Sequence, residues 1–138
     1  LLGFGTILDE GEPLDSPRVL AAAGPGVSVA YHAFLEQRDE RLASLPNADR
    51  FVALAEAVPA GERHLALHAG HLTELNDIDR QVVVGEALTM LPLVCTARAL
   101  PERIERLAGS GITEIAFQPM GDIARELRAF AVAAGLGR

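Results

Sequence analysis

A short polar turn, Cys95-Thr96-Ala97, lies between an apolar run and an amphipathic helical pattern. The first amide groups of a helix have no partner within the helix, and together with the helix dipole they attract anions. Thr96 and the amides of Cys95 and Ala97 could therefore hold a phosphate group. Thr96 could instead serve only as the N-cap of the helix, and the sequence leaves both interpretations open.

Three histidines, His64, His68 and His71, have spacings that would align them on one face of a helix, as in some metal sites. We interpret residues 64–69 instead as a strand, because the segment is short and runs into a glycine-containing loop. That interpretation predicts no metal site. It places His68 and His71 at the carboxyl end of a strand, where they could bind a ligand or move a proton. A histidine pair satisfied by backbone groups is the alternative.

Alternating strand and helix patterns are expected to position these groups. Strands are predicted at residues 2–8, 64–69, 93–96 and 112–118. Helices are predicted from residue 17 to a break at Gly24-Pro25-Gly26, at 27–41, at 47–58, between 76 and 92, at 100–108 and after Asp122. The clearest unit is the helix carrying Leu100, Ile104 and Leu107, which glycines separate from the next strand.

The pattern predicts an α/β fold in which parallel strands are each followed by a helix. Four such βα units make up half of a TIM-type (β/α)8 barrel, and we expect residues 1–138 to form one partial domain of this kind. A complete open α/β sheet of four or five strands is the alternative. In both architectures ligands bind at the carboxyl ends of the strands, so Cys95-Thr96-Ala97 and Gln118-Pro119 are the first candidate site residues.

The composition is that of a folded, acidic protein. Twelve basic and nineteen acidic residues give a net charge of −7, which disfavours binding to nucleic acid or to an anionic membrane surface. The single cysteine, Cys95, excludes an internal disulfide and is consistent with a reducing cytoplasm. Because the chain lacks an initiator Met and begins within a strand pattern, we expect it to be a fragment.

Three groups of residues together resemble the luciferase-like family of flavin-dependent monooxygenases and reductases. They are Gly5-Thr-Ile-Leu-Asp-Glu-Gly-Glu12 with Ser16-Pro-Arg-Val-Leu-Ala-Ala-Ala-Gly-Pro25, then Glu62-Arg-His-Leu-Ala-Leu-His-Ala-Gly-His-Leu72, and then Cys95-Thr-Ala97 with Gly111-Ile-Thr-Glu-Ile-Ala-Phe-Gln-Pro119. The likeness runs over most of the chain and corresponds to the C-terminal half of such a protein. In this family a Gly-Thr turn after the seventh strand commonly contacts the coenzyme phosphate, and here Cys95-Thr96 stands in its place.

The resemblance implies an oxidoreductase or monooxygenase that uses FMN or a deazaflavin coenzyme for hydride transfer or oxygen insertion on a small organic substrate. Cys95, Thr96, Ala97 and Gln118 would then contact the coenzyme, and His68 and His71 would border the substrate as catalytic residues. Another copy of the chain, or a missing N-terminal half, would complete the site. The alternative is a non-catalytic α/β module that oligomerises through an exposed strand edge and has lost coenzyme binding.

Overall fold

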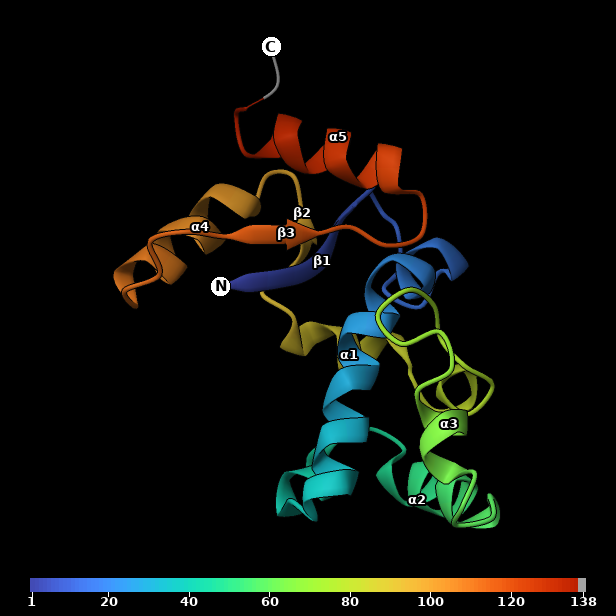
Figure 1. Ribbon diagram of the computed structural model, residues 1–138. Helices are drawn as coiled ribbons and strands as arrows, with labels where there is room; N and C mark the ends of the chain where they lie inside the picture. Colours follow the sequence, from blue (N-terminus) through green and yellow to red (C-terminus); the bar gives the residue numbers. More distant parts are fainter. Residues whose placement is uncertain (137–138) are drawn as a thin grey trace.

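The computed structural model describes residues 1–136, which form a small parallel sheet with helices on both faces (Figure 1). The strands are β1 (Leu2–Leu8), β2 (Leu93–Thr96) and β3 (Ala116–Gln118). The α-helices are α1 (Pro17–Gln37), α2 (Ala48–Ala57), α3 (Arg63–Leu67), α4 (Leu100–Gly109) and α5 (Ile123–Ala133). Three 3-10 turns, η1 (Glu40–Ser44), η2 (Asp79–Gln81) and η3 (Gly85–Met90), complete the described elements.

The sheet has the order β2-β1-β3, and both pairings are parallel. Gly5 of β1 pairs with Leu93 of β2, and Leu2 of β1 pairs with Ala116 of β3. The parallel α/β class is therefore confirmed. The order differs from that of a barrel, where consecutive strands are neighbours, because β3 pairs with β1 and not with β2. This order is compatible with an open α/β sheet, but the described sheet has three strands where that alternative predicts four or five.

Successive side chains of each strand point to opposite faces of the sheet, and this divides the core into two clusters. Val94 and Phe4 face α1, where they pack with Val19, Val27 and other buried residues. Leu93, Cys95 and Ile7 face the opposite side, where the partly buried Ile104 of α4 and Phe130 of α5 cover them. Helix α1 therefore covers one face of the sheet, and α4 and α5 cover the other.

The predicted strand at residues 64–69 is wrong. Residues Arg63–Leu67 form the short helix α3, and His68 is its C-cap. The apolar residues of this segment do not alternate between two buried faces, since Leu67 is buried while Leu65 is 74% exposed. The predicted strand at 112–118 is too long, because only Ala116–Gln118 pairs with β1.

The predicted break at Gly24-Pro25-Gly26 is also wrong, because α1 continues through all three residues. Proline removes one helical hydrogen bond, and glycine weakens a helix, so a break is the local preference. Here all three residues are buried, and the absence of a side chain on Gly26 lets α1 approach β1 closely. Tertiary packing has overridden local propensity.

The remaining predicted elements fall close to the observed ones. Strands 2–8 and 93–96 are confirmed, as are the helices that correspond to α2, α4 and α5. The region between 76 and 92 holds the two 3-10 turns η2 and η3 where a longer helix was predicted. Among the helices of residues 1–136, none combines the length and the apolar composition needed to cross a membrane.

Candidate functional site

The carboxyl end of β1 lies at a point where the chain leaves neighbouring strands toward opposite faces of the sheet. From β1 the chain passes to α1 on one face, whereas from β2 and β3 it passes to α4 and α5 on the other. In open α/β sheets ligands bind in the crevice formed at such a point. The central strand therefore has two candidate crevices, one toward β3 and one toward β2.

The crevice between β1 and β3 is filled by a network of charged side chains. At its centre is Glu126 of α5, which is only 1% exposed. The Thr6 hydroxyl donates to Glu126 Oε2 over 2.7 Å, and Arg18 Nη1 donates to Oε1 over 2.8 Å. Arg125 Nη1 donates to the same Oε1 over 2.9 Å. Both carboxylate oxygens are thus occupied, as a buried charge requires.

The two arginines also satisfy the free edge of β1 beyond the end of β3. Pairing with β3 stops at Phe4, so the Ile7 carbonyl has no partner on that strand. Arg125 Nη1 donates to this carbonyl over 2.9 Å, and Arg125 Nη2 donates to Asp9 over 2.7 Å. This crevice is therefore a structural junction that ties β1, α1 and α5 together.

Glu12, in the turn after β1, holds the second arginine of the junction in place. It contacts the Arg18 guanidinium through both carboxylate oxygens and accepts from the Ser16 hydroxyl over 2.9 Å. The hydrogen bonds from Arg18 lower the pKa of Glu12 from 4.5 to about 2. Glu12 therefore remains ionised in acid that protonates an ordinary glutamate.

We expect acid to destabilise the fold through this carboxylate. The pKa of Glu12 is lower in the folded chain, so its contribution is fully present above about pH 4.5 and is lost as the pH falls toward about 2. The loss should be roughly 1–2 kcal/mol after screening by solvent. In urea unfolding, Glu12→Gln should have a lower free energy of unfolding than the wild type at pH 7, and this difference should disappear near pH 2. Glu10→Gln, on the same exposed turn, should follow the wild-type profile, and a constant Glu12→Gln deficit would contradict the expectation.

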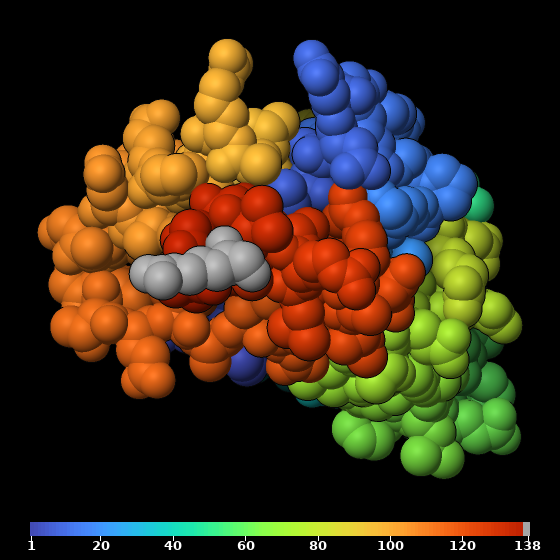
Figure 2. All heavy atoms as spheres, turned by 90° about the horizontal axis from the view of Figure 1, so that it is seen from above, coloured from blue at the N-terminus to red at the C-terminus, as the bar shows by residue number. Residues whose placement is uncertain are grey.

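The crevice between β1 and β2 is open. It forms a hollow of about 430 Å³ lined by Leu8, Glu10, Gly11, Thr96, Ala97 and Arg98. Figure 2 shows the segment near residue 97 and the segment near residue 10 rising on either side of it. Two of the predicted coenzyme-binding residues, Thr96 and Ala97, line this hollow. Gln118 does not, because it pairs with Phe4 on the other side of β1.

Thr96 is free to contact a ligand. The N-cap of α4 is Ala99, and no side chain caps this helix, so Thr96 does not serve as its N-cap. The Thr96 side chain is exposed, and its backbone carbonyl accepts from the Ala99 amide over 3.0 Å. Cys95, in contrast, is buried in the core beneath α4, and burial raises the pKa of its thiol. The cysteine side chain therefore does not enter the hollow.

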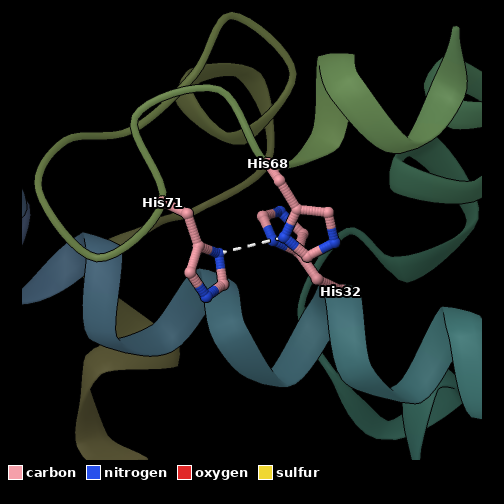
Figure 3. A group of neighbouring side chains, drawn as sticks. All are labelled: His32, His68 and His71. Atoms are coloured by element: carbon pink, nitrogen blue, oxygen red, sulfur yellow. Dashed lines mark hydrogen bonds between the residues drawn. The ribbon is translucent and has the colours of Figure 1, made fainter.

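The histidines predicted to border the substrate lie elsewhere. His68 and His71 follow α3 and meet His32 of α1, and in Figure 3 the three rings converge. Arg18, at the junction, and His32 are 14 positions apart on α1, which corresponds to roughly 21 Å along the helix. The structure thus brings His68 and His71 together but places them away from Thr96 and Ala97.

Each of two histidines in this cluster is held by a carboxylate. His32 is 2% exposed, and its Nε2 lies 2.9 Å from Oδ1 of the buried Asp79. His68 Nε2 lies 2.7 Å from Glu36 Oε1, and its Nδ1 lies 3.2 Å from His71 Nδ1. Desolvation by the surrounding side chains and the neighbouring imidazoles lower the pKa of the exposed His71, which favours its neutral form.

The sequence interpretation missed His32, Glu36 and Asp79. One signal was present: His32 and Glu36 are four residues apart in a helical pattern, so they share a helix face. Nothing in the sequence links that face to His68, since the pattern of residues 64–69 predicts a strand.

The chain matches no family model, no curated protein and no solved structure. The two arrangements described above therefore carry the functional argument. One is an open hollow at the strand ends, lined by the exposed Thr96 and Arg98 and, on its other wall, by Glu10. The other is a partly buried cluster of three histidines with two carboxylates behind it.

Proposed function

We propose that this chain is part of an oxidoreductase that binds FMN or a deazaflavin coenzyme at the carboxyl ends of β1 and β2. The observation that carries the proposal is the open hollow lined by Thr96, Ala97 and Arg98. It lies where the chain leaves β1 and β2 toward opposite faces of the sheet. Both coenzymes carry phosphate, and this is the part of the coenzyme that the hollow suits. The resemblance to luciferase-like proteins supplies the coenzyme class.

The residues of the hollow fit a phosphate group. Arg98 is exposed and supplies positive charge, and the N-terminus of α4, which no side chain caps, follows directly and favours an anion through the helix dipole. Glu10 on the opposite wall is the one acidic residue among the described residues of the lining, and Arg98 offsets its charge. The Cys95 side chain packs into the core, so it does not obstruct the hollow. The coenzyme would supply the redox chemistry, by accepting or donating a hydride or by reacting with oxygen in its reduced form.

The proposal includes completion of the site by another copy of the chain or by further sequence. The hollow between the ends of β1 and β2 is open to solvent, so a ring system bound there would remain in contact with water. The barrel half implied by the resemblance belongs to this completed state. It would require β3 to leave β1 and to pair in chain order.

A fluorescence titration with FMN and with the deazaflavin coenzyme tests the proposal. It should be combined with light scattering over a range of protein concentrations, to relate binding to self-association. Arg98→Glu should weaken coenzyme binding by about tenfold or more, since it reverses the charge beside the phosphate. Arg128→Glu is the matched control, because Arg128 is equally exposed but lies on α5.

Equal binding by the two variants would overturn the assignment of the hollow. Absence of binding at every concentration, together with elution as an oligomer, would favour the alternative of a non-catalytic module that associates with itself. That alternative has its own structural support, because β2 and β3 are edge strands of the described sheet.

A further inference from the structure

We propose that His32, His68 and His71 form a binding site for a divalent transition metal ion, best suited to Zn²⁺. One ring nitrogen from each of the three lies within 4.8 Å of the other two. The side chains come from two parts of the chain, α1 and the turn after α3, and Figure 3 shows them directed toward a common point. This site is separate from the hollow at the strand ends and does not depend on coenzyme binding.

The hydrogen bonds fix which nitrogen atoms are free to bind a metal. A carboxylate can only accept, so the Nε2 atom of His32 carries the hydrogen that faces Asp79, and that of His68 carries the hydrogen that faces Glu36. In each ring the Nδ1 lone pair is therefore available. A carboxylate behind a ligating histidine is the usual arrangement at zinc sites, where it fixes the ring and strengthens the ligand.

The Nδ1 atom of His32 provides an independent indication. It is buried and has no hydrogen-bond partner among the described residues. A buried acceptor without a partner is costly, and native folds normally satisfy such atoms. The neighbouring rings of His68 and His71 lie 5.3 and 5.9 Å from the His32 ring between centroids. A cation held by all three residues would satisfy this atom.

The spacing of the other two ligands also fits. His68 Nδ1 and His71 Nδ1 are 3.2 Å apart. In a tetrahedral site with Zn–N bonds of about 2.0–2.1 Å, two ligand nitrogens are about 3.3 Å apart. Without metal, the hydrogen on His71 Nδ1 faces His68 Nδ1. Metal binding would shift that hydrogen to Nε2 of the exposed His71, by proton exchange with solvent, so that the ring stays neutral and its Nδ1 lone pair is free.

The site is expected to keep an open coordination position. Three histidines supply three of the four ligands of a tetrahedral zinc ion, and the exposure of His71 gives water access to the remaining position. A second possible group, Glu36 with His64 and His68, shares His68 and lies at the surface. We favour the first group because Glu36 is already the hydrogen-bond acceptor of His68.

Calorimetric titration of the full chain with Zn²⁺ alone tests the proposal, with protein purified without a polyhistidine tag. Binding of one ion per chain is expected, and Co²⁺ should give the visible absorption of a tetrahedral nitrogen site. His71→Ala should weaken Zn²⁺ binding by more than about 100-fold, and Asp79→Asn by about 10- to 100-fold. His71 is exposed, so its removal should leave the fold intact, which thermal melting without metal verifies.

His64→Ala is the matched control, because His64 is an exposed histidine beside the cluster and outside the proposed ligand set. Its Zn²⁺ affinity should stay within about twofold of the wild type. Three results would each overturn the proposal: no binding of Zn²⁺ by the wild type, unchanged binding by His71→Ala, or an equal loss in His64→Ala. None of them bears on coenzyme binding at the strand ends.

Discussion

Replacing Glu126 by glutamine should lower the free energy of unfolding by about 2–3 kcal/mol. Glu126 is the acceptor for Thr6, Arg18 and Arg125, and its side chain is almost completely buried. Glutamine has nearly the same shape but is neutral, and it replaces one of the two accepting oxygens with an amide donor. Two guanidinium groups would then share one neutral carbonyl oxygen.

An exposed ion pair provides the matched control for this substitution. Glu102 and Arg106 form a pair four residues apart on the outer face of α4. Pairs of this kind contribute little, so Glu102→Gln should change stability by less than about 0.5 kcal/mol. Urea unfolding at pH 7 compares the two variants directly. The free energy of unfolding of Glu126→Gln could instead lie within about 0.5 kcal/mol of the wild-type value, as for a surface pair. In that case the junction does not hold β1, α1 and α5 together as described.

The junction also explains why only one crevice beside β1 is a candidate binding site. Charged side chains from both faces of the sheet meet between β1 and β3 and satisfy one another. Between β1 and β2 no such network is present among residues 1–136, and Arg98 lies there exposed. Stability and binding are thus assigned to opposite sides of the same strand.

The elements that sequence reasoning predicted are those with a strong local pattern. Helix α4 places Leu100, Ile104 and Leu107 on the face that packs against β2, and glycine ends it. The first strand is equally clear from its apolar run. In each case the buried face lies within one segment, so the sequence of that segment suffices.

The elements that were missed depend on contacts distant in the chain. His32 and Asp79 are 47 residues apart, and each is buried because the other is present. Asn76 holds the loop that carries Asp79, by donating to the Leu67 carbonyl over 2.7 Å. No pattern within residues 64–69 reports these contacts. The local pattern of this segment therefore predicts a strand and places its histidines at the strand ends, whereas the distant contacts stabilise a helix.

Gly26→Ala should lower the free energy of unfolding by about 1–3 kcal/mol. A Cβ atom at this position would lie 2.5 Å from Phe4 Cβ and 2.7 Å from Phe4 Cγ. Phe4 Cβ is fixed to the backbone of β1, so the clash cannot be relieved by side-chain rotation, and α1 or β1 must move. The usual gain from replacing a helical glycine by alanine, about 0.5–1 kcal/mol, is therefore reversed.

Gly109→Ala, at the end of α4, is the control that separates the steric clash from the gain in helix propensity. A Cβ atom there would meet nothing within 4 Å, so this variant should be as stable as the wild type or more stable by up to about 1 kcal/mol. Equilibrium unfolding in urea measures both changes. A Gly26→Ala variant as stable as Gly109→Ala would mean that α1 does not approach β1 at this point.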